Sequence, residues 1–289
     1  MLIRQQVSCH MTGHFFSESE AIMKHHNVVL PMVLLVVLSA ITACGIYIYL
    51  ETKDIEEDVA VVENVKQQVV LEPLILPVDT ILAESKPVQT DQNLLRRIDF
   101  TELQSINTDA TRWVYIPDTN IDYYVMQEQT VGEYYYLWRD IHKKQSSWGS
   151  ILTPKEPMNM EDAHLLLFGH HMRDKTVAFS SLNLYNDQSY GEGHPYVYLY
   201  YPDRSERWKL WAVCNSNSSD MIYEIPYTLG SDAYQSLIHN IDSIKTYGLG
   251  EVPDNTTQTL VLSTCRGSQG GSPLRFYIVC VLDDVYYYE

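Results

Sequence analysis

The chain is poor in cationic side chains and lacks several motifs that mark common enzyme classes. Its 289 residues contain 20 Lys and Arg against 37 Asp and Glu, which gives a net charge of -17. Nucleic acids and anionic lipid headgroups attract clustered Lys and Arg, so this charge argues against nucleic acid as a partner and against attachment to lipid by charge. No Gly-x-Ser-x-Gly turn is present, which disfavours that class of serine hydrolase. No internal repeat is present either.

A long apolar run is present near the N-terminus, over residues 28–50. At about 1.5 Å per residue, a helix of this length spans about 34 Å, enough for a hydrocarbon core of about 30 Å. Basic residues precede the run and acidic residues follow it, so the bulk of the chain is expected outside the cell. A signal peptide cut near Ala43 and a lipoprotein motif at Cys44 are alternatives. The apolar run continues past Ala43, which favours an uncleaved anchor.

Four segments follow from this pattern: a cytoplasmic N-terminus over residues 1–27, a transmembrane helix over 28–50, an extracellular linker over 51–90 and a folded domain over 91–289. The linker mixes acidic residues, valines and prolines without a sustained period, with helix expected in part of it, near residues 55–70. Either Met1 or Met23 serves as the start of translation in this scheme.

The folded domain is rich in short β-type runs separated by turns. Eight runs predict strands, over residues 113–116, 121–127, 149–152, 163–168, 196–201, 207–212, 259–263 and 275–282. Such a series predicts a mainly β domain, either a closed barrel or a sandwich.

Two segments of the domain have helical periodicity instead. Apolar residues recur at helix-like spacing from Leu94 to Leu103, after Asp91, and predict an amphipathic helix ahead of the strands. Apolar residues recur three and four apart within residues 231–247 and predict a helix inserted between strands.

Cysteines are scarce, and three of the five follow the anchor: Cys214, Cys265 and Cys280. Three is an odd number, so at least one thiol is unpaired in a monomer. Cys214 and Cys280 lie in apolar strands and are expected to be small buried residues, with a disulfide between them left open. Cys265 ends an apolar strand before a Gly/Ser-rich loop. It is either a buried strand-end thiol or a nucleophile.

A nucleophilic thiol needs a proton partner, and His170 and Arg275 complete a set for acyl transfer. Imidazole with a pKa near 6.5 can accept and return a proton, and a guanidinium can stabilise an oxyanion. His170 and His171 point to opposite sides of an extended chain, so one of them faces Cys265. His164 is expected at a strand edge on the surface. A metal site of the three histidines matches no common ligand spacing.

These segments resemble, in the same order, those of the class B sortases, membrane-anchored cysteine transpeptidases of Gram-positive bacteria. Residues 120–127 resemble the family's early strand, residues 168–172 its histidine segment, and residues 262–265 with Arg275 its cysteine and arginine segments. The resemblance covers residues 95–289.

The resemblance implies a sortase-like eight-stranded β-barrel with an N-terminal helix and an inserted helix before the cysteine strand. It implies that Cys265 forms a thioacyl enzyme with the Thr of a C-terminal sorting signal, that His170 transfers the protons and that Arg275 stabilises the oxyanion. Thr264 and Ser263 are then expected in the substrate groove, and neither a cofactor nor a metal is required.

The partners implied are surface proteins with a sorting signal, and an amine acceptor on the peptidoglycan cross-bridge or on a pilin. The location implied is the cell membrane, as a single-pass type II protein with an extracellular catalytic domain. One position departs from the family: Gly267 stands where an acidic residue is common two places after the cysteine.

Two other functions remain as alternatives. A cysteine peptidase would use the same residues and let water resolve the thioester, although no papain-like or caspase-like sequence surrounds Cys265. A non-catalytic β-barrel binding module would keep the cysteine and histidine as structural residues.

Overall fold

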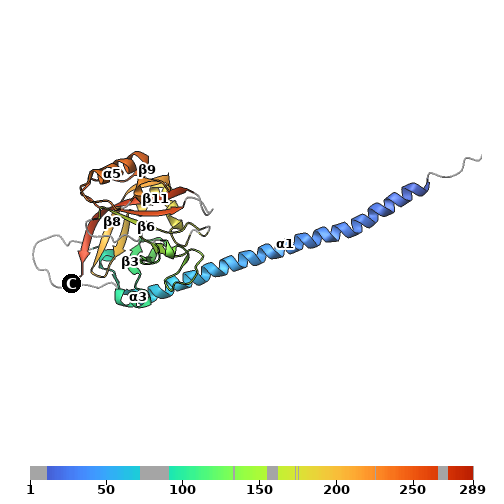
Figure 1. The fold of residues 1–289 in the computed structure, drawn as a ribbon, viewed down its shortest axis with the longest axis horizontal. Coiled ribbons are helices and arrows are strands. Elements are labelled where there is room, and N and C mark those ends of the chain that lie inside the picture. Colours follow the sequence, from blue (N-terminus) through green and yellow to red (C-terminus); the bar gives the residue numbers. More distant parts are fainter. Residues whose placement is uncertain are drawn as a thin grey trace, which may run out of the picture. The chain divides into compact units, whose positions relative to one another are not determined.

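The computed structural model describes residues 12–71, 91–132, 134–154, 162–172, 174, 176–224, 226–265 and 273–288, and the backbone alone for residues 12–28. The chain forms two units that divide between Asp54 and Ile55. The first is helical and the second contains the strands (Figure 1).

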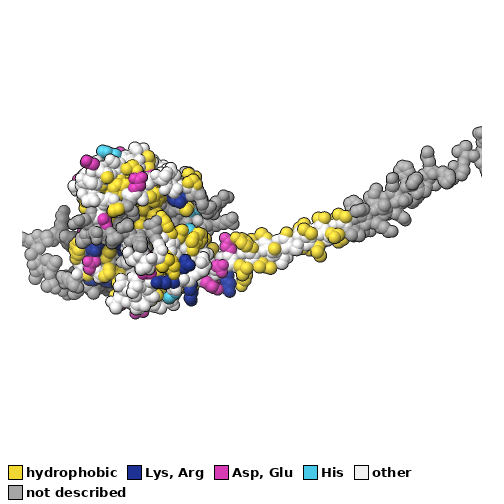
Figure 2. All heavy atoms as spheres, in the orientation of Figure 1, with side chains coloured by type: hydrophobic (Ala, Val, Ile, Leu, Met, Phe, Trp, Pro, Cys, Tyr) yellow, Lys and Arg dark blue, Asp and Glu magenta, His cyan; other side chains and the backbone are white. Residues whose placement is uncertain are grey.

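Helix α1 spans Thr12–Val69 and contains the whole apolar run. Among the described residues it provides one helix long and apolar enough to cross a membrane, judged by length and composition alone. Hydrophobic side chains line this part of α1 (Figure 2), and large ones such as Leu35 and Val36 are 71% and 64% exposed. A helix that exposes apolar side chains in this way is typical of a membrane span.

The last part of α1 packs into the second unit. Val62, Val65 and Val69 are buried in its core, and the backbone N–H of Asp99 donates to the Val69 carbonyl at 2.7 Å. Strand β1 (Val70–Leu71) then pairs with β2 (Arg97–Ile98). Residues 55–71 were expected in a linker. The structure differs there because their apolar residues recur on one face and are buried against the domain.

The eight predicted strands are all present. They are β3 (Ala110–Tyr115), β4 (Asp122–Met126), β5 (Ile151–Leu152), β6 (His164–Phe168), β7 (Tyr196–Tyr200), β8 (Arg204–Asn217), β10 (Thr259–Cys265) and β11 (Leu274–Tyr287). They pair in the order β11, β10, β6, β5, β4, β3, β7, β8, and β11 also pairs with β8. The sheet is therefore a closed eight-stranded barrel, as predicted.

The inserted helix is shorter than predicted. Helix α5 spans Asp232–Ile244, with the Ser231 side chain capping its first turn. Residues 245–247 were expected in this helix but belong to β9 (Lys245–Gly248), which pairs with β8. Strand β8 is longer than β7, and the part of β8 that extends beyond β7 pairs with β9 instead.

The predicted helix ahead of the strands is two short helices, α2 (Gln92–Leu95) and α3 (Phe100–Ile106). Side chains of Asp91 and Asp99 cap their N-termini, which starts each helix separately. Strand β2 separates them because β1 requires an extended partner. The remaining helices are η1 (Tyr135–Trp138), η2 (Ser180–Asn186), α4 (Gln188–Gly193) and η3 (Met221–Tyr223).

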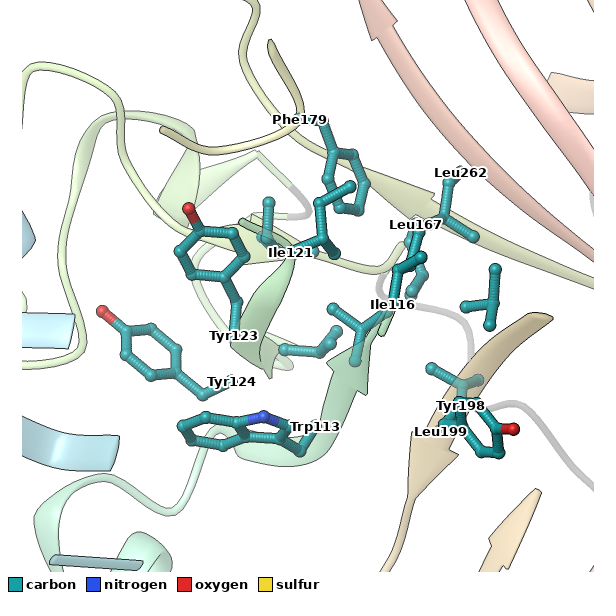
Figure 3. Packing of buried hydrophobic residues seen from close by; sticks show 14 of the residues in the cluster. Trp113, Ile116, Ile121, Tyr123, Tyr124, Leu167, Phe179, Tyr198, Leu199 and Leu262 are labelled. Atoms are coloured by element: carbon teal, nitrogen blue, oxygen red, sulfur yellow. The ribbon is translucent and has the colours of Figure 1, made fainter. Parts of the chain in front are cut away.

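Two hydrophobic clusters use opposite faces of the same strands. The larger contains side chains such as Trp113, Leu167 and Leu262 from all around the ring and fills the barrel (Figure 3). The smaller contains Leu166 and Val261, the sequence neighbours of two of these, together with the apolar face of α5. Because successive side chains alternate between faces, α5 covers the outside of β6, β10 and β11.

We expect Val65→Ala to lower the free energy of unfolding by roughly 1–3 kcal/mol, because it removes fully buried methyl groups and leaves a cavity. Val59→Ala, on the same helix but 36% exposed, is the matched control and should change it little. Urea unfolding of both proteins measures the difference. Equal midpoints would show that residues 55–69 do not belong to the folded core.

Candidate active site

A cavity of about 280 Å³ opens where β6 and β10 end and β11 begins. Three predicted catalytic residues, His170, Cys265 and Arg275, line it together with Ser263 and Thr264. Its other lining residues are Tyr134, Leu137, Pro154, Leu166, Phe168, Gly169, Ser218 and Tyr223. The structure thus brings five residues predicted from three separate segments into one cavity.

Strand register places the three candidates side by side. Cys265 is directly opposite Arg275 at the end of the antiparallel β10–β11 pair, and opposite residues project their side chains to the same face. On the other side, β6 runs parallel to β10 with Ser263 beside Phe168. This ladder ends there, and His170 follows two residues after Phe168 as Cys265 follows two residues after Ser263. His170, Cys265 and Arg275 all line the cavity.

The site lies on the outer face of the barrel. Along β10, Cys265 shares its face with Val261, and along β11, Arg275 shares its face with Tyr277. Val261 and Tyr277 belong to the cluster beneath α5, not to the barrel interior. The cysteine and arginine are both half-buried. A polypeptide can therefore reach them without entering the core.

His170 is held by residues that the sequence did not indicate. Its Nε2 lies 2.8 Å from the Leu137 carbonyl oxygen, and its ring centroid lies 4.4 Å from that of Trp138. A carbonyl oxygen can only accept, so Nε2 carries a proton and Nδ1 is the nitrogen left to exchange one. Burial lowers the pKa of His170 from its ordinary 6.5, although the bond to Leu137 opposes this. The imidazole is therefore mainly neutral at pH 7.

Gly169, the residue after β6, is hydrogen-bonded to β10 next to the site. Its N–H donates to the Ser263 carbonyl at 3.1 Å, and its own carbonyl accepts from the Thr264 hydroxyl at 2.8 Å. A side chain on Gly169 would meet Ile151 at 2.6 Å and the Phe179 ring at 2.7 Å. This position accepts glycine alone without displacing its neighbours.

Ser263 and Thr264 line the cavity, but their hydroxyls have partners within the protein. Both residues are buried, at 1% and 2% exposed. Ser263 Oγ lies 2.7 Å from the Tyr223 hydroxyl, and Tyr223 stacks on Phe168 with ring centroids 5.8 Å apart. Burial raises the pKa of Tyr223 to about 12, so its hydroxyl stays protonated.

Arg275 is half-buried because it is the second residue of β11, beside the exposed Leu274. Its guanidinium Nη1 donates to the Leu274 carbonyl at 3.0 Å. The strand position explains how this charge reaches the edge of the cavity while Phe276 next to it is fully buried.

His164 is not the surface residue that the sequence predicted. It is 2% exposed, with Nδ1 2.9 Å from Thr259 Oγ1 and Nε2 3.1 Å from the Ile222 carbonyl. Burial lowers its pKa to about 4. The prediction failed because α5 and η3 cover this face, which no local pattern reveals. His171 contacts Asn183 instead, so the three histidines have different protein partners.

Cys214 and Cys280 are buried free thiols, as expected for small residues of apolar strands. Burial raises the pKa of Cys214 to about 12 and that of Cys280 further. No disulfide joins them. Such thiols are poor nucleophiles, in contrast to the half-buried Cys265 in the cavity.

Sequence reasoning missed three aromatic residues around the site: Tyr134 and Tyr223 line the cavity, and Trp138 packs on the His170 ring. The dense aromatic run at residues 134–138 was the available signal for Tyr134 and Trp138. Nothing in the sequence linked this run to His170. Gly267, where the sequence departs from the family pattern, lies outside the described residues.

Comparisons with known proteins agree with this fold. No protein-family model matches the chain. Sortase B of Listeria monocytogenes is 23% identical over 193 residues, covering 64% of this chain and 77% of the relative. Sortase B of Staphylococcus aureus is 24% identical over 187 residues, covering 63% and 74%. A crystal structure of sortase B from B. anthracis in complex with AAEK1 superposes with a TM-score of 0.60 at 22% identity, covering 80% and 98%.

The structural likeness shows the fold of the sortases. Together with the two curated relatives, it supports a class B sortase, that is, a cysteine transpeptidase. Sortases are cell-surface enzymes. The sortase fold accounts for the closed barrel.

We expect the His170 imidazole of this sortase to titrate below 6.5, because burial disfavours its charged form. Nitrogen-15 NMR of the histidine rings in the full chain, assigned by comparison with His170→Gln, measures this directly. The lowered pKa also affects the free energy of unfolding. Its contribution to stability is fully present above pH 6.5 and is lost as the pH falls through the folded-state pKa. A pKa above 6.5 would contradict this account.

We expect Gly169→Ala to destabilise the fold by about 1–3 kcal/mol through overpacking against Ile151 and Phe179. Activity should fall as well, because the backbone beneath His170 must shift. Gly193→Ala is the control, since a side chain there would meet nothing within 4 Å. Thermal unfolding and turnover of both variants test this. If Gly169→Ala matched Gly193→Ala, the close packing at residue 169 would be refuted.

Proposed function

We propose that this sortase cleaves a C-terminal sorting signal after its Thr and transfers the protein to an amine. Sγ of Cys265 attacks the Thr carbonyl carbon as His170 takes the thiol proton. The carbon–nitrogen bond breaks as His170 gives that proton to the leaving amide nitrogen, and the product is a thioester on Cys265. An incoming amine then attacks the thioester and gives a proton to His170. The carbon–sulfur bond breaks, a new amide forms, and His170 returns the proton to the sulfur, which restores the thiol.

The observation that carries this proposal is the register of three neighbouring chain segments around Cys265. Cys265 pairs with Arg275 across β10 and β11, and His170 follows β6 at the corresponding height. All three line one cavity on the accessible face. A nucleophile, a proton carrier and a cation within one cavity are the groups that acyl transfer requires.

His170 suits a role in both directions of proton transfer. Its Nε2 is fixed on the Leu137 carbonyl, which orients the ring and reserves Nδ1 for exchange. A lowered pKa keeps Nδ1 unprotonated at neutral pH, ready to take a proton from the thiol or from the incoming amine. Because burial lowers the pKa of His170, the imidazolium that results is a stronger acid than an exposed one, which favours donation to the leaving nitrogen.

Arg275 is proposed to stabilise the oxyanion of the tetrahedral intermediate. Its register position opposite Cys265 supports this role, because a guanidinium near the nucleophile is available to a developing negative charge. Loss of one such donor typically lowers kcat by about 10²–10³. Ser263 and Thr264 are proposed to shape the groove with their backbone, because their hydroxyls are already hydrogen-bonded.

The apolar run of residues 28–50 is proposed as a single transmembrane anchor, with residues 1–27 in the cytoplasm and the barrel unit outside. This supports a type II protein that meets its substrates at the cell surface. Surface proteins with a sorting signal are the proposed donors. The amine acceptor is proposed to be a peptidoglycan cross-bridge or a pilin lysine.

We expect the full chain in detergent to form an acyl adduct on Cys265 with one member of a sorting-signal peptide library. Adding an amine should release a ligated peptide. Intact-protein mass spectrometry detects the adduct, and liquid chromatography with mass spectrometry detects the ligated product. Arg275→Lys, which keeps the charge but loses the planar fork, should lower turnover about 100-fold.

Cys265→Ala is the control that must abolish both signals, whereas Cys214→Ala should retain the reaction because that thiol is buried. Hydrolysis without ligation for every amine tested would favour the cysteine peptidase. Absence of any adduct, with Cys265 unreactive towards methanethiosulfonate, would favour a binding module and refute the proposal.

A further inference from the structure

The face of α1 that packs on the barrel unit carries one carboxylate among apolar residues. Ile55, Val62, Val65 and Val69 contact or enter the core, and Asp58 falls on the same face at a spacing of three and four. Asp58 is half-buried, whereas Glu56 and Glu57 nearby are exposed. A carboxylate in such a stripe is costly unless it is hydrogen-bonded.

Asp58 is bound by the segment that precedes β5. Its Oδ2 accepts from Ser146 Oγ, from the Ser147 N–H and from Ser147 Oγ, each at 2.9 Å. These are charge-assisted bonds, which are stronger than neutral ones. Ser146 is 3% exposed, so its hydroxyl depends on protein partners. Asp58 thereby fixes both serines to α1.

Ser146 in turn is hydrogen-bonded to the last residue of η1. Its backbone N–H donates to the Trp138 carbonyl at 3.1 Å, and its Oγ accepts from the Gly149 N–H at 2.9 Å. Gly149 has φ of +62°, and a side chain there would lie 2.1 Å from the Leu137 carbonyl oxygen. The backbone at Gly149 is therefore in direct contact with Leu137.

Leu137 and Trp138 are the two residues that hold His170. The Leu137 carbonyl accepts from His170 Nε2, and the Trp138 ring lies on the imidazole. A continuous set of contacts thus runs from Asp58 through Ser146 to the backbone and ring that orient His170.

We propose that Asp58 is a positioning residue for His170, acting through Ser146 and the backbone of η1. The proposal rests on the proposed role of His170 as the proton carrier. Asp58 follows Leu50, the last residue of the apolar run, by eight residues in the same helix. The part of α1 that follows the proposed anchor therefore also sets the orientation of the imidazole.

The test uses the full chain in detergent micelles and four variants: Asp58→Ala, Asp58→Asn, Ser146→Ala and Asp54→Ala. Asp58→Ala should lower kcat about tenfold with KM changed less than twofold, since a small displacement of a catalytic group slows chemistry more than binding. Asp58→Asn keeps an acceptor oxygen and should recover most of the activity. Asp54→Ala, an exposed carboxylate one turn earlier, is the matched control and should match the wild type.

A second readout follows His170 itself. In Asp58→Ala, the histidine-ring NMR titration of His170 should move towards the ordinary pKa of 6.5, because a loosened ring meets more water. Ser146→Ala should have the same effect, and the double variant should add little to either single one, as expected for residues in one connected set.

Wild-type kcat and an unchanged His170 titration in Asp58→Ala would overturn the proposal. So would an equal loss in Asp54→Ala, or fully additive effects of Asp58→Ala and Ser146→Ala. Failure of the proposed role of His170 can be told apart from failure of this proposal. It would appear as full activity in His170→Ala, whereas the NMR titration of His170 would still respond to Asp58→Ala.

Discussion

The pairing of β10 with β6 on one side and β11 on the other is the constraint on which the site depends. Because side chains alternate along a strand, a shift of one residue in either ladder would turn Cys265 away from its neighbours. Gly169 fixes the end of one ladder through its bonds to the backbone of Ser263 and the hydroxyl of Thr264. On the other side of β10, the pairing of β11 with β8, which closes the barrel, fixes the position of β11 and so the β10–β11 ladder. The chemistry therefore follows from backbone register more than from any single side-chain contact.

The two faces of the same strands have different roles. The inner face is apolar and closely packed, and its thiol at Cys280 is sealed from solvent. The outer face begins as a second core beneath α5 and ends as a cavity at Cys265. A thiol that reacts with a polypeptide must be held by a rigid backbone and must be accessible from solvent. The last residue of an outward-facing row on a strand meets both conditions. Helix α5 buries the rest of that row.

The histidine belongs to a different set of contacts from the cysteine and arginine. It follows β6, but its ring is oriented by η1, which packs against Gly149 and Ser146. Burial and the Leu137 carbonyl act on its pKa in opposite directions, and burial prevails. The site thus combines a part set by strand register with a part set by a loop, and the loop part extends to Asp58 on α1.

The sequence by itself determined the eight strands, the inserted helix and the apolar run, because each depends on local periodicity. Short motifs and the family resemblance pointed to Cys265, His170 and Arg275, which the structure brings to one cavity. The sequence did not reveal that residues 55–69 pack into the domain, that His164 is buried or that residues 245–247 form a strand. Each of these depends on a partner distant in the chain: the core beneath α1, the cover of η3 and the free edge of β8. The contacts of Tyr134, Trp138 and Tyr223 around the site were missed for the same reason. Local pattern specifies which elements form and which groups can react, whereas only the tertiary structure decides which side chains meet, since burial and hydrogen-bond partners come from residues far apart in sequence.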